Sequence, residues 1–254
     1  MDPTSYFLGM IYYIVSKLAR NLLECSLLAS MSKLMKRALI LGASGGIGGA
    51  VVEILREQHW DVTCLSRSVD QIDITNEDSV MAAFTSVKGP FDFTLIATGA
   101  LEINSSPEKT VSHLLENNMI DQFTTNAIGP ALILKHLRSF LDKKSSPIVS
   151  VLSARVGSIE DNKLGGWYSY RAAKAALNQI IKSFSIELSR THPNACVLAI
   201  HPGTVDTNLT YKYASKHPTQ TPAVAAENIL DVTLNKDSSH TGRFFDWADK
   251  EIPW

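Results

Sequence analysis

The sequence predicts an α/β fold, a doubly wound parallel sheet in a single domain. Strand-like and helix-like segments alternate over residues 37–200, which is typical of parallel strands joined by right-handed crossover helices. The chain has 254 residues, of which 45% are hydrophobic, and this is ample for one large core. We therefore expect a ligand beyond the carboxyl ends of the strands.

The first strand and the turn after it form the most specific local pattern. Residues 37–41 are a short apolar run, followed by Gly42-Ala43-Ser44-Gly45-Gly46-Ile47-Gly48 and a helical stretch at 49–58. Glycines let a turn approach a pyrophosphate closely, and the positive end of the helix attracts its oxygens. A flexible loop is the alternative, but the flanking strand and helix favour a nucleotide-binding, Rossmann-like turn.

The remaining elements follow in order. Apolar runs at 62–65, 148–152 and 195–200 predict buried strands, and 71–73 predicts a short one. Helices are expected from Thr75 and Asp78, over 120–140, and from Pro222. Another helix carries Tyr170 and continues with apolar residues at helical spacing, namely Leu177, Ile180, Ile181, Phe184 and Leu188. Polar and turn-forming residues over 204–221 predict a mobile flap above a substrate.

Tyr170 and Lys174 are spaced so that both side chains lie on one helix face, one turn apart. Free tyrosine titrates near pH ~10, so it exchanges protons poorly at neutrality unless a nearby positive charge favours the phenolate. Lys174 supplies that charge. A solvated helix face is the alternative for the pair alone, and the glycine turn favours the catalytic interpretation.

With both motifs present, the chain resembles the short-chain dehydrogenase/reductase family from about residue 34 to residue 254. The segments 157–159, 165–167, 242–245 and 252–254 are similar to its C-factor-like and carbonyl-reductase-like branch. In this family an asparagine, a serine, a tyrosine and a lysine act together. The resemblance implies that Asn126 kinks a helix and holds a water linked to Lys174. A plain helix-surface amide is the alternative for Asn126.

Two serines compete for the family's serine position. Ser153 follows the strand at 148–152, where many relatives carry two adjacent serines, but the second of the pair is Ala154 here. We expect Ser153 to donate a hydrogen bond to a substrate carbonyl oxygen. Ser158 is the alternative because its distance from Tyr170 is closer to the common family spacing, although residues 160–167 resemble an insertion. Either serine could instead cap a turn.

The resemblance also assigns cofactor contacts. His201-Pro202-Gly203-Thr204-Val205-Asp206-Thr207 is similar to the loop that embraces nicotinamide, and Asp73 resembles the aspartate that bonds adenine; for each, an ordinary turn is the alternative. Leu41 and the run 96–99 depart from the family pattern in the scaffold. The expected cofactor-binding residues are Gly42, Ser44, Gly46, Ile47, Gly48, Ser66, Arg67, Asp73, Gly99, Tyr170, Lys174, Pro202, Gly203, Val205 and Thr207.

The end of the second strand favours NADP(H) over NAD. Ser66 and Arg67 stand there, without an acidic residue to bond a free ribose hydroxyl pair and repel a phosphate. Arg67 can contact a 2′-phosphate bidentately, and Ser66 can donate another hydrogen bond. A solvated surface charge is the alternative for Arg67.

The resemblance implies an NADP(H)-dependent oxidoreductase that transfers hydride between nicotinamide and a carbonyl or alcohol substrate. Tyr170 would be the general acid and base, Ser153 would hold the oxygen, and Lys174 would bind ribose. The alternative is an NADP(H)-binding sensor or signalling protein with little turnover, which Ala154 favours. An epimerase-like relative fits less well because the chain lacks a large substrate domain. The family also implies a homodimer or homotetramer.

Composition narrows the partners further. A net charge of −1 indicates neither nucleic acid nor an anionic surface. The three cysteines form no Cys-x-x-Cys pair and the seven histidines lack ligand spacing, so we expect a reducing, cytoplasmic location and no metal. Residues 1–33 are expected to be an N-terminal extension, whose apolar run at 6–15 is too short to span a bilayer of ~30 Å. Organelle targeting, an interfacial helix or an over-long reading frame are the interpretations of this extension.

Overall fold

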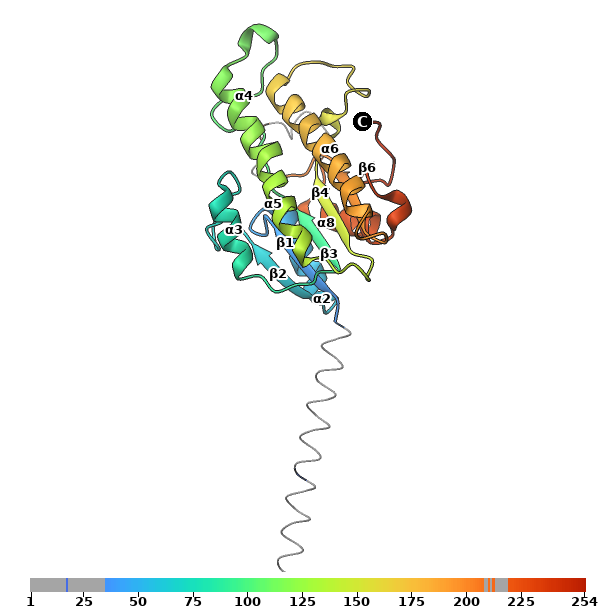
Figure 1. The fold of residues 1–254 in the computed structure, drawn as a ribbon. Helices are drawn as coiled ribbons and strands as arrows, with labels where there is room; N and C mark the ends of the chain where they lie inside the picture. Colours follow the sequence, from blue (N-terminus) through green and yellow to red (C-terminus); the bar gives the residue numbers. More distant parts are fainter. Residues whose placement is uncertain (1–16, 18–34, 208–209, 211, 213–218) are drawn as a thin grey trace, which may run out of the picture. The chain divides into compact units, whose positions relative to one another are not determined.

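Six parallel strands form one sheet in the order β2-β1-β3-β4-β5-β6 (Figure 1). The computed structural model describes residues 17, 35–207, 210, 212 and 219–254. The chain divides into two units, Met1–Lys36 and Arg37–Trp254, and the sheet belongs to the second. Its strands are β1 (Arg37–Leu41), β2 (Asp61–Leu65), β3 (Phe93–Ile96), β4 (Ile148–Leu152), β5 (Cys196–His201) and β6 (Arg243–Asp246).

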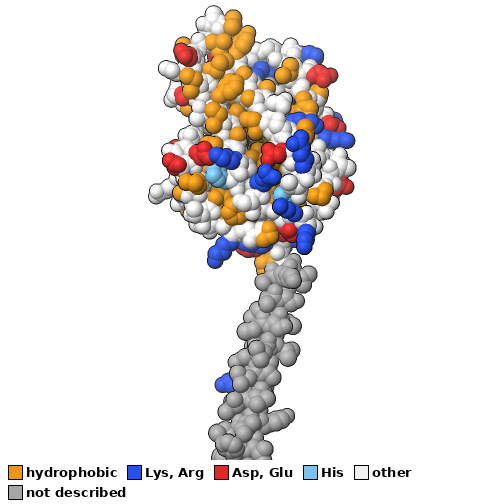
Figure 2. Space-filling model, viewed as in Figure 1, with side chains coloured by type: hydrophobic (Ala, Val, Ile, Leu, Met, Phe, Trp, Pro, Cys, Tyr) orange, Lys and Arg blue, Asp and Glu red, His pale blue; other side chains and the backbone are white. Residues whose placement is uncertain are grey.

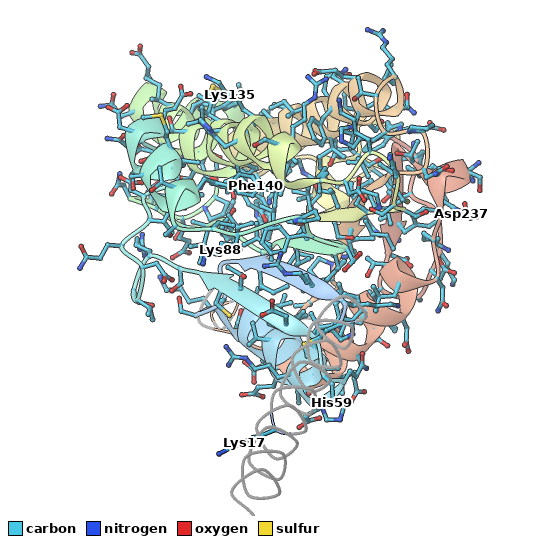
Figure 3. All side chains as sticks on the ribbon, turned by 60° about the horizontal axis from the view of Figure 1, so that its bottom comes forward. Lys17, His59, Lys88, Lys135, Phe140 and Asp237 are labelled. Carbon is cyan, nitrogen blue, oxygen red and sulfur yellow. The ribbon has the colours of Figure 1, made fainter. Side chains whose placement is uncertain are left out.

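Helices cover both faces of this sheet (Figure 3). The α-helices are α2 (Gly46–Glu57), α3 (Glu77–Thr85), α4 (Glu116–Phe123), α5 (Gly129–Leu137), α6 (Tyr168–Ser189) and α8 (Pro222–Leu234). A π-helical turn (Thr124–Ile128) joins α4 to α5. Short 3₁₀ turns occur at Val111–His113, Arg138–Phe140, Arg155–Gly157 and Ser238–His240. No helix in the described part of the chain combines the length and hydropathy that a bilayer crossing requires.

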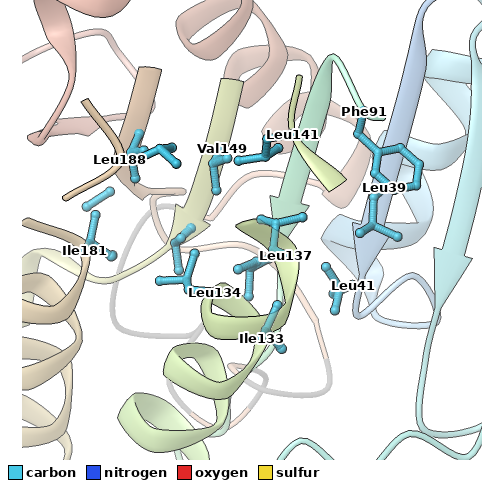
Figure 4. Packing of buried hydrophobic residues seen from close by; sticks show 14 of the residues in the cluster. Leu39, Leu41, Phe91, Ile133, Leu134, Leu137, Leu141, Val149, Ile181 and Leu188 are labelled. Carbon is cyan, nitrogen blue, oxygen red and sulfur yellow. The ribbon is translucent and has the colours of Figure 1, made fainter. Parts of the chain in front are cut away.

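Each strand divides its side chains between two cores, because successive residues of a strand point to opposite faces. Leu39 and Leu41 of β1 belong to the same hydrophobic cluster as side chains of α3, α5 and α6 (Figure 4), whereas Ala38 and Ile40 belong to the cluster that includes side chains of α2 and α8. The residues of β1 are almost all fully buried, as expected for a strand covered on both sides. The predicted doubly wound parallel sheet is therefore confirmed.

The order in which successive strands are added to the sheet reverses at β1. The chain passes from β1 to β2 on one side, and returns to place β3 and the later strands on the other side. Because helices leave the carboxyl ends of β1 and β3 toward different faces, a crevice forms there. The glycine turn after β1 and residues 97–101 after β3 lie at this point.

Several predicted boundaries are wrong. Residues 71–73 form no strand, because Gln71 has a left-handed backbone (φ +57°) and the segment pairs with no strand. The helix after the glycine turn begins at Gly46 rather than at residue 49. Asn76, not Thr75 or Asp78, caps α3, and its side chain accepts from the Asp78 and Ser79 amides. The helix predicted over 120–140 starts at Glu116 and contains the π-helical turn.

Two predictions fall mainly outside the described residues. The extension predicted over residues 1–33 is described only at Lys17, so its separation from the domain stays a prediction. The flap predicted over 204–221 is described at its two ends and at Thr210 and Lys212.

Candidate active site

A cavity of about 1130 Å³ lies at the carboxyl ends of the central strands. Its wall is made by the glycine turn, by residues 97–101 after β3, by residues 152–156 at the end of β4, and by residues 201–207 at the end of β5. Tyr170, Arg171 and Lys174 of α6 complete it. This volume slightly exceeds that of typical drug-sized ligand pockets, so it accommodates a dinucleotide or a large ligand.

The glycine turn is shaped by close backbone contacts. A Cβ on Gly48 would lie 2.3 Å from the Gly42 carbonyl oxygen, and a Cβ on Gly42 (φ +85°) would lie 2.6 Å from the Ala97 oxygen. Gly45, the N-cap of α2, offers no side-chain cap, and the first turn of α2 contains no acidic residue. The positive end of α2 therefore faces the cavity with its amides uncapped by side chains, which fits the phosphates of a dinucleotide.

Of the residues predicted to bind the adenosine end of the cofactor, one lines the cavity and two do not. Arg67 lines the cavity. Ser66 does not, and its hydroxyl donates to the Asp70 carboxylate at 3.2 Å. Asp73 also lies outside the lining, and its carboxylate accepts from the Thr75 hydroxyl at 2.7 Å, which lowers the pKa of Asp73. Gly42 shapes the turn without lining the cavity.

Asn126 lies in the π-helical turn and is fully buried, so its interpretation as a surface amide is wrong. Its Oδ1 accepts from the Ala100 amide at 3.0 Å, and its Nδ2 donates to the Ala100 carbonyl at 2.8 Å. Gln122, one turn earlier, donates to the Leu101 carbonyl at 2.9 Å. Both side chains thus hold the segment after β3 against the helix. The expected water relay through Asn126 stays a prediction.

The structure brings Tyr170 and Lys174 together on the buried face of α6. Their exposed fractions are 9% and 4%, and the Lys174 Nζ lies 5.9 Å from the centre of the Tyr170 ring. Lys174 also donates to the Leu152 carbonyl at 3.2 Å, which ties α6 to the end of β4. Burial raises the pKa of Tyr170 and lowers the pKa of Lys174 to about 8. The sequence expectation of a lowered Tyr170 pKa is therefore not met, because burial disfavours the charged phenolate.

Three left-handed residues and a buried carboxylate set the start of α6. Gly165, Gly166 and Trp167 have φ values of +64°, +66° and +53°. The Glu108 carboxylate accepts from the Ser169 hydroxyl, from the Ser169 amide at 3.2 Å and from Asn118 Nδ2 at 2.8 Å. These bonds hold the first turn of α6 immediately before Tyr170. Sequence reasoning missed Glu108, because no local pattern links residues this far apart.

Ser153 and Ala154 line the cavity, whereas Ser158 does not. The Ser158 hydroxyl accepts from the Asp161 amide at 3.0 Å, which is a turn-capping bond. The Ser153 hydroxyl donates to Asn178 Oδ1 at 2.6 Å. Ser153 is thus the serine at the end of β4 that the geometry favours, although its proton is engaged by α6.

The loop after β5 closes the opposite wall. Gly203 has φ +78°, and Gln220 donates to the Pro202 carbonyl at 2.5 Å. A Cβ on Gly46 would lie 2.8 Å from Thr207 Cγ2, so this loop contacts the glycine turn. Ser44, Gly46, Ile47, Gly48 and Gly99 line the same cavity as Pro202, Gly203, Val205 and Thr207. Arg155 and Trp167 are among the lining residues that sequence reasoning did not single out.

The buried ammonium of Lys174 should be visible in the pH dependence of stability. Its pKa is about 8 in the folded chain against an ordinary value of 10.5, so the unfolded chain binds more protons between these values. The free energy of unfolding should therefore rise with pH across this window, by up to about 1.4 kcal/mol per pH unit. Urea unfolding of the wild type and Lys174→Met at a series of pH values measures this contribution.

The surface residue Lys135, with 61% of its side chain exposed, provides the control. Lys135→Met should keep the wild-type pH dependence, whereas Lys174→Met should lose the rise. Equal slopes for Lys174→Met and the wild type would contradict a buried ammonium at this position.

Comparison with known proteins identifies the class to which the fold and site belong. The model of the family described as short chain dehydrogenase matches residues 36–218. The chain therefore belongs to the short-chain dehydrogenase family of oxidoreductases.

Individual relatives agree with this membership. The chain is 31% identical over 225 residues to a 1-hydroxy-2-glutathionyl-2-methyl-3-butene dehydrogenase of Rhodococcus sp. (strain AD45), covering 83% of this chain and 96% of that protein. It is 33% identical over 138 residues to C-signal of Myxococcus xanthus, covering 54% of this chain and 79% of C-signal.

Solved structures show the same fold. A short-chain dehydrogenase/reductase from Burkholderia multivorans with bound NADP has a TM-score of 0.72 at 23% identity, over 87% of this chain and 100% of that chain. An NADPH-bound carbonyl reductase from chicken fatty liver has a TM-score of 0.71 at 22% identity, over 87% and 94% of the two chains.

Proposed function

We propose that this protein is an NADPH-dependent carbonyl reductase. The observation that carries the proposal is the placement of Tyr170, Lys174 and Ser153 in one cavity with the uncapped end of α2. Several relatives with this fold are named as carbonyl reductases or contain NADP(H). Bound NADPH would supply the hydride.

The side chains of this protein then handle the substrate oxygen. Tyr170 keeps its proton at neutral pH because burial raises its pKa, so the phenol can donate to an oxygen that gains negative charge. Ser153 lies at the end of β4 on the same cavity and would hold that oxygen. Lys174, largely protonated at pH 7 with a pKa of about 8, would stabilise the phenolate that remains and bind the ribose.

Several residues of the cavity would hold parts of a dinucleotide. The glycine turn and α2 would hold the pyrophosphate, and the backbone of Val205 with the hydroxyl of Thr207 would hold the carboxamide. Arg67 lies at the cavity wall after β2, where a 2′-phosphate would be bound. The proposed contact of Ser66 requires its hydroxyl to leave Asp70, whereas Asp73 accepts from Thr75 through Oδ1 and could still accept from adenine through Oδ2.

The test is to mix the purified protein with NADPH and follow cofactor oxidation across a panel of aldehydes and ketones. Oxidation that depends on both protein and carbonyl supports the proposal. Tight NADPH binding without oxidation of any panel member would instead favour the sensor, for which Ala154 in the cavity wall is the structural reason. Absence of NADPH binding would contradict both functions.

Arg67→Ala is expected to separate the two nicotinamide cofactors. Loss of a charge-assisted contact to the 2′-phosphate should raise the dissociation constant for NADPH about tenfold or more. Binding of NADH, which lacks this phosphate, should be nearly unchanged and is the internal control. Titration calorimetry with both cofactors measures the effect, and an equal loss for both would assign Arg67 to the scaffold.

A homo-oligomer is proposed as the working assembly. Hydrophobic side chains gather on the face of the molecule over α4 (Figure 2), where Val111, Leu115, Ile120 and Ile128 are each about half exposed or more. An apolar surface of this kind is often buried between subunits. Sedimentation of the wild type and Ile120→Glu tests whether this face associates.

A further inference from the structure

The buried face of α6 that carries Tyr170 and Lys174 has a further polar side chain one turn later, Asn178. Tyr170, Lys174 and Asn178 are spaced at successive turns, and all three are buried on the face that meets the sheet. Asn178 is 3% exposed and does not line the cavity. It therefore acts on a ligand only through a neighbour, and that neighbour is Ser153.

The hydrogen bond from Ser153 to Asn178 uses the proton that Ser153 would need to hold a carbonyl oxygen. A serine hydroxyl has one proton, and Ser153 gives it to Asn178 Oδ1 at 2.6 Å. In this arrangement only oxygen lone pairs remain for the cavity. An oxygen that gains negative charge is stabilised by donors, and the side chain of Ala154 beside Ser153 has none to add to the Tyr170 phenol.

The NH₂ group of the same Asn178 amide donates no hydrogen bond to any described residue. Asn178 Nδ2 is buried and has no hydrogen-bond partner among the described residues. Leaving a buried donor unpaired destabilises the folded chain. Because the oxygen and the NH₂ group of an amide are nearly equal in size, a half-turn of the side chain reverses the polarity of the bond without changing the packing.

We propose that Asn178 is a positioning residue for the reduction, whose NH₂ group donates to Ser153 Oγ in the working state. The Ser153 proton is then free to point into the cavity and bind the carbonyl oxygen. The inference rests on the proposed carbonyl reductase function. The end of β4 keeps its place independently of Asn178, since Lys174 holds the Leu152 carbonyl.

Two replacements of Asn178 distinguish this role from simple packing. Asn178→Asp keeps the shape but offers only acceptors when ionised, so it should hold the Ser153 proton away from the cavity and lower kcat by about 10²-fold, as removal of Ser153 itself should. Asn178→Leu changes the shape but leaves the Ser153 proton free, so it should lower kcat by no more than about tenfold. If Asn178 only fills space, Asn178→Leu should lower kcat more than Asn178→Asp does.

The double variants and a control complete the kinetic test. In a Ser153→Ala background, neither Asn178 replacement should lower kcat further, because the hydroxyl that Asn178 orients is gone. Ser185→Ala removes another buried hydroxyl of α6, which donates to the Lys182 carbonyl at 2.7 Å, and should keep kcat. Additive losses in the double variants, or wild-type kcat in Asn178→Asp, would overturn the proposal.

A spectroscopic readout does not depend on turnover. The side-chain amide signal of Asn178, identified by its loss in Asn178→Leu, is followed in the ¹⁵N-labelled protein with NADP⁺ added. If Nδ2 donates to Ser153, Ser153→Ala should speed hydrogen exchange of this NH₂ group, and an unchanged exchange rate would overturn the inference. If the wild type reduces no carbonyl but Ser153→Ala still speeds exchange of the Asn178 NH₂ group, the proposed function is contradicted and the bond between Asn178 and Ser153 is not.

Discussion

Tyr170→Phe is expected to lower kcat for carbonyl reduction by about 10²–10⁴-fold, the usual contribution of a positioned general acid. The phenol lines the cavity, and burial keeps it protonated, so its removal leaves no proton donor at that position. The aromatic ring and its edge contact with Trp167, at 6.2 Å between centroids, remain in the variant. Cofactor affinity should therefore be nearly unchanged.

Tyr168→Phe provides the matched control for this experiment. Tyr168 begins the same helix but is 38% exposed and does not line the cavity, so its variant should turn over like the wild type. Steady-state rates with saturating NADPH, together with a fluorescence titration of NADPH, measure both quantities. Wild-type turnover by Tyr170→Phe would remove the chemical role assigned to this residue.

Gly48→Ala should abolish detectable binding of NADPH. A Cβ at this position would meet the Gly42 carbonyl oxygen at 2.3 Å and its carbonyl carbon at 2.9 Å. Both atoms belong to the backbone of the same turn, so the turn itself must shift to accept the methyl group. The shift moves the amides at the start of α2 away from the pyrophosphate, and overpacking of this kind typically costs ~1–3 kcal/mol of stability.

The next residue provides the comparison. A Cβ on Gly49 would approach the Ala43 oxygen only to 3.3 Å, and alanine favours the helix more than glycine does. Gly49→Ala should therefore retain NADPH binding and unfold at a temperature close to that of the wild type. Thermal unfolding with and without NADPH tests both variants, and a ligand-induced shift of wild-type size in Gly48→Ala would refute the pyrophosphate assignment.

Local patterns were sufficient for the parallel sheet, the glycine turn and the alignment of Tyr170 with Lys174. Each depends on backbone periodicity or on residues within two helical turns of one another, and such spacing is directly readable. The strand predicted at 71–73 failed because a strand also needs a pairing partner. The start of α3 was misplaced because three polar residues competed for one cap, and the Asn76 side chain made the capping bonds.

The order and spacing of the amino acids were enough to predict a short-chain dehydrogenase fold with a nucleotide turn and an aligned tyrosine and lysine. Contacts between distant segments show that Ser153 faces the cavity while Ser158 caps a turn, that Glu108 holds the start of α6, and that Asn178 bonds Ser153. The fold also buries Tyr170, which raises the pKa of its phenol. These properties arise from contacts between distant segments and from exclusion of water, and neither is encoded in the spacing of neighbouring residues.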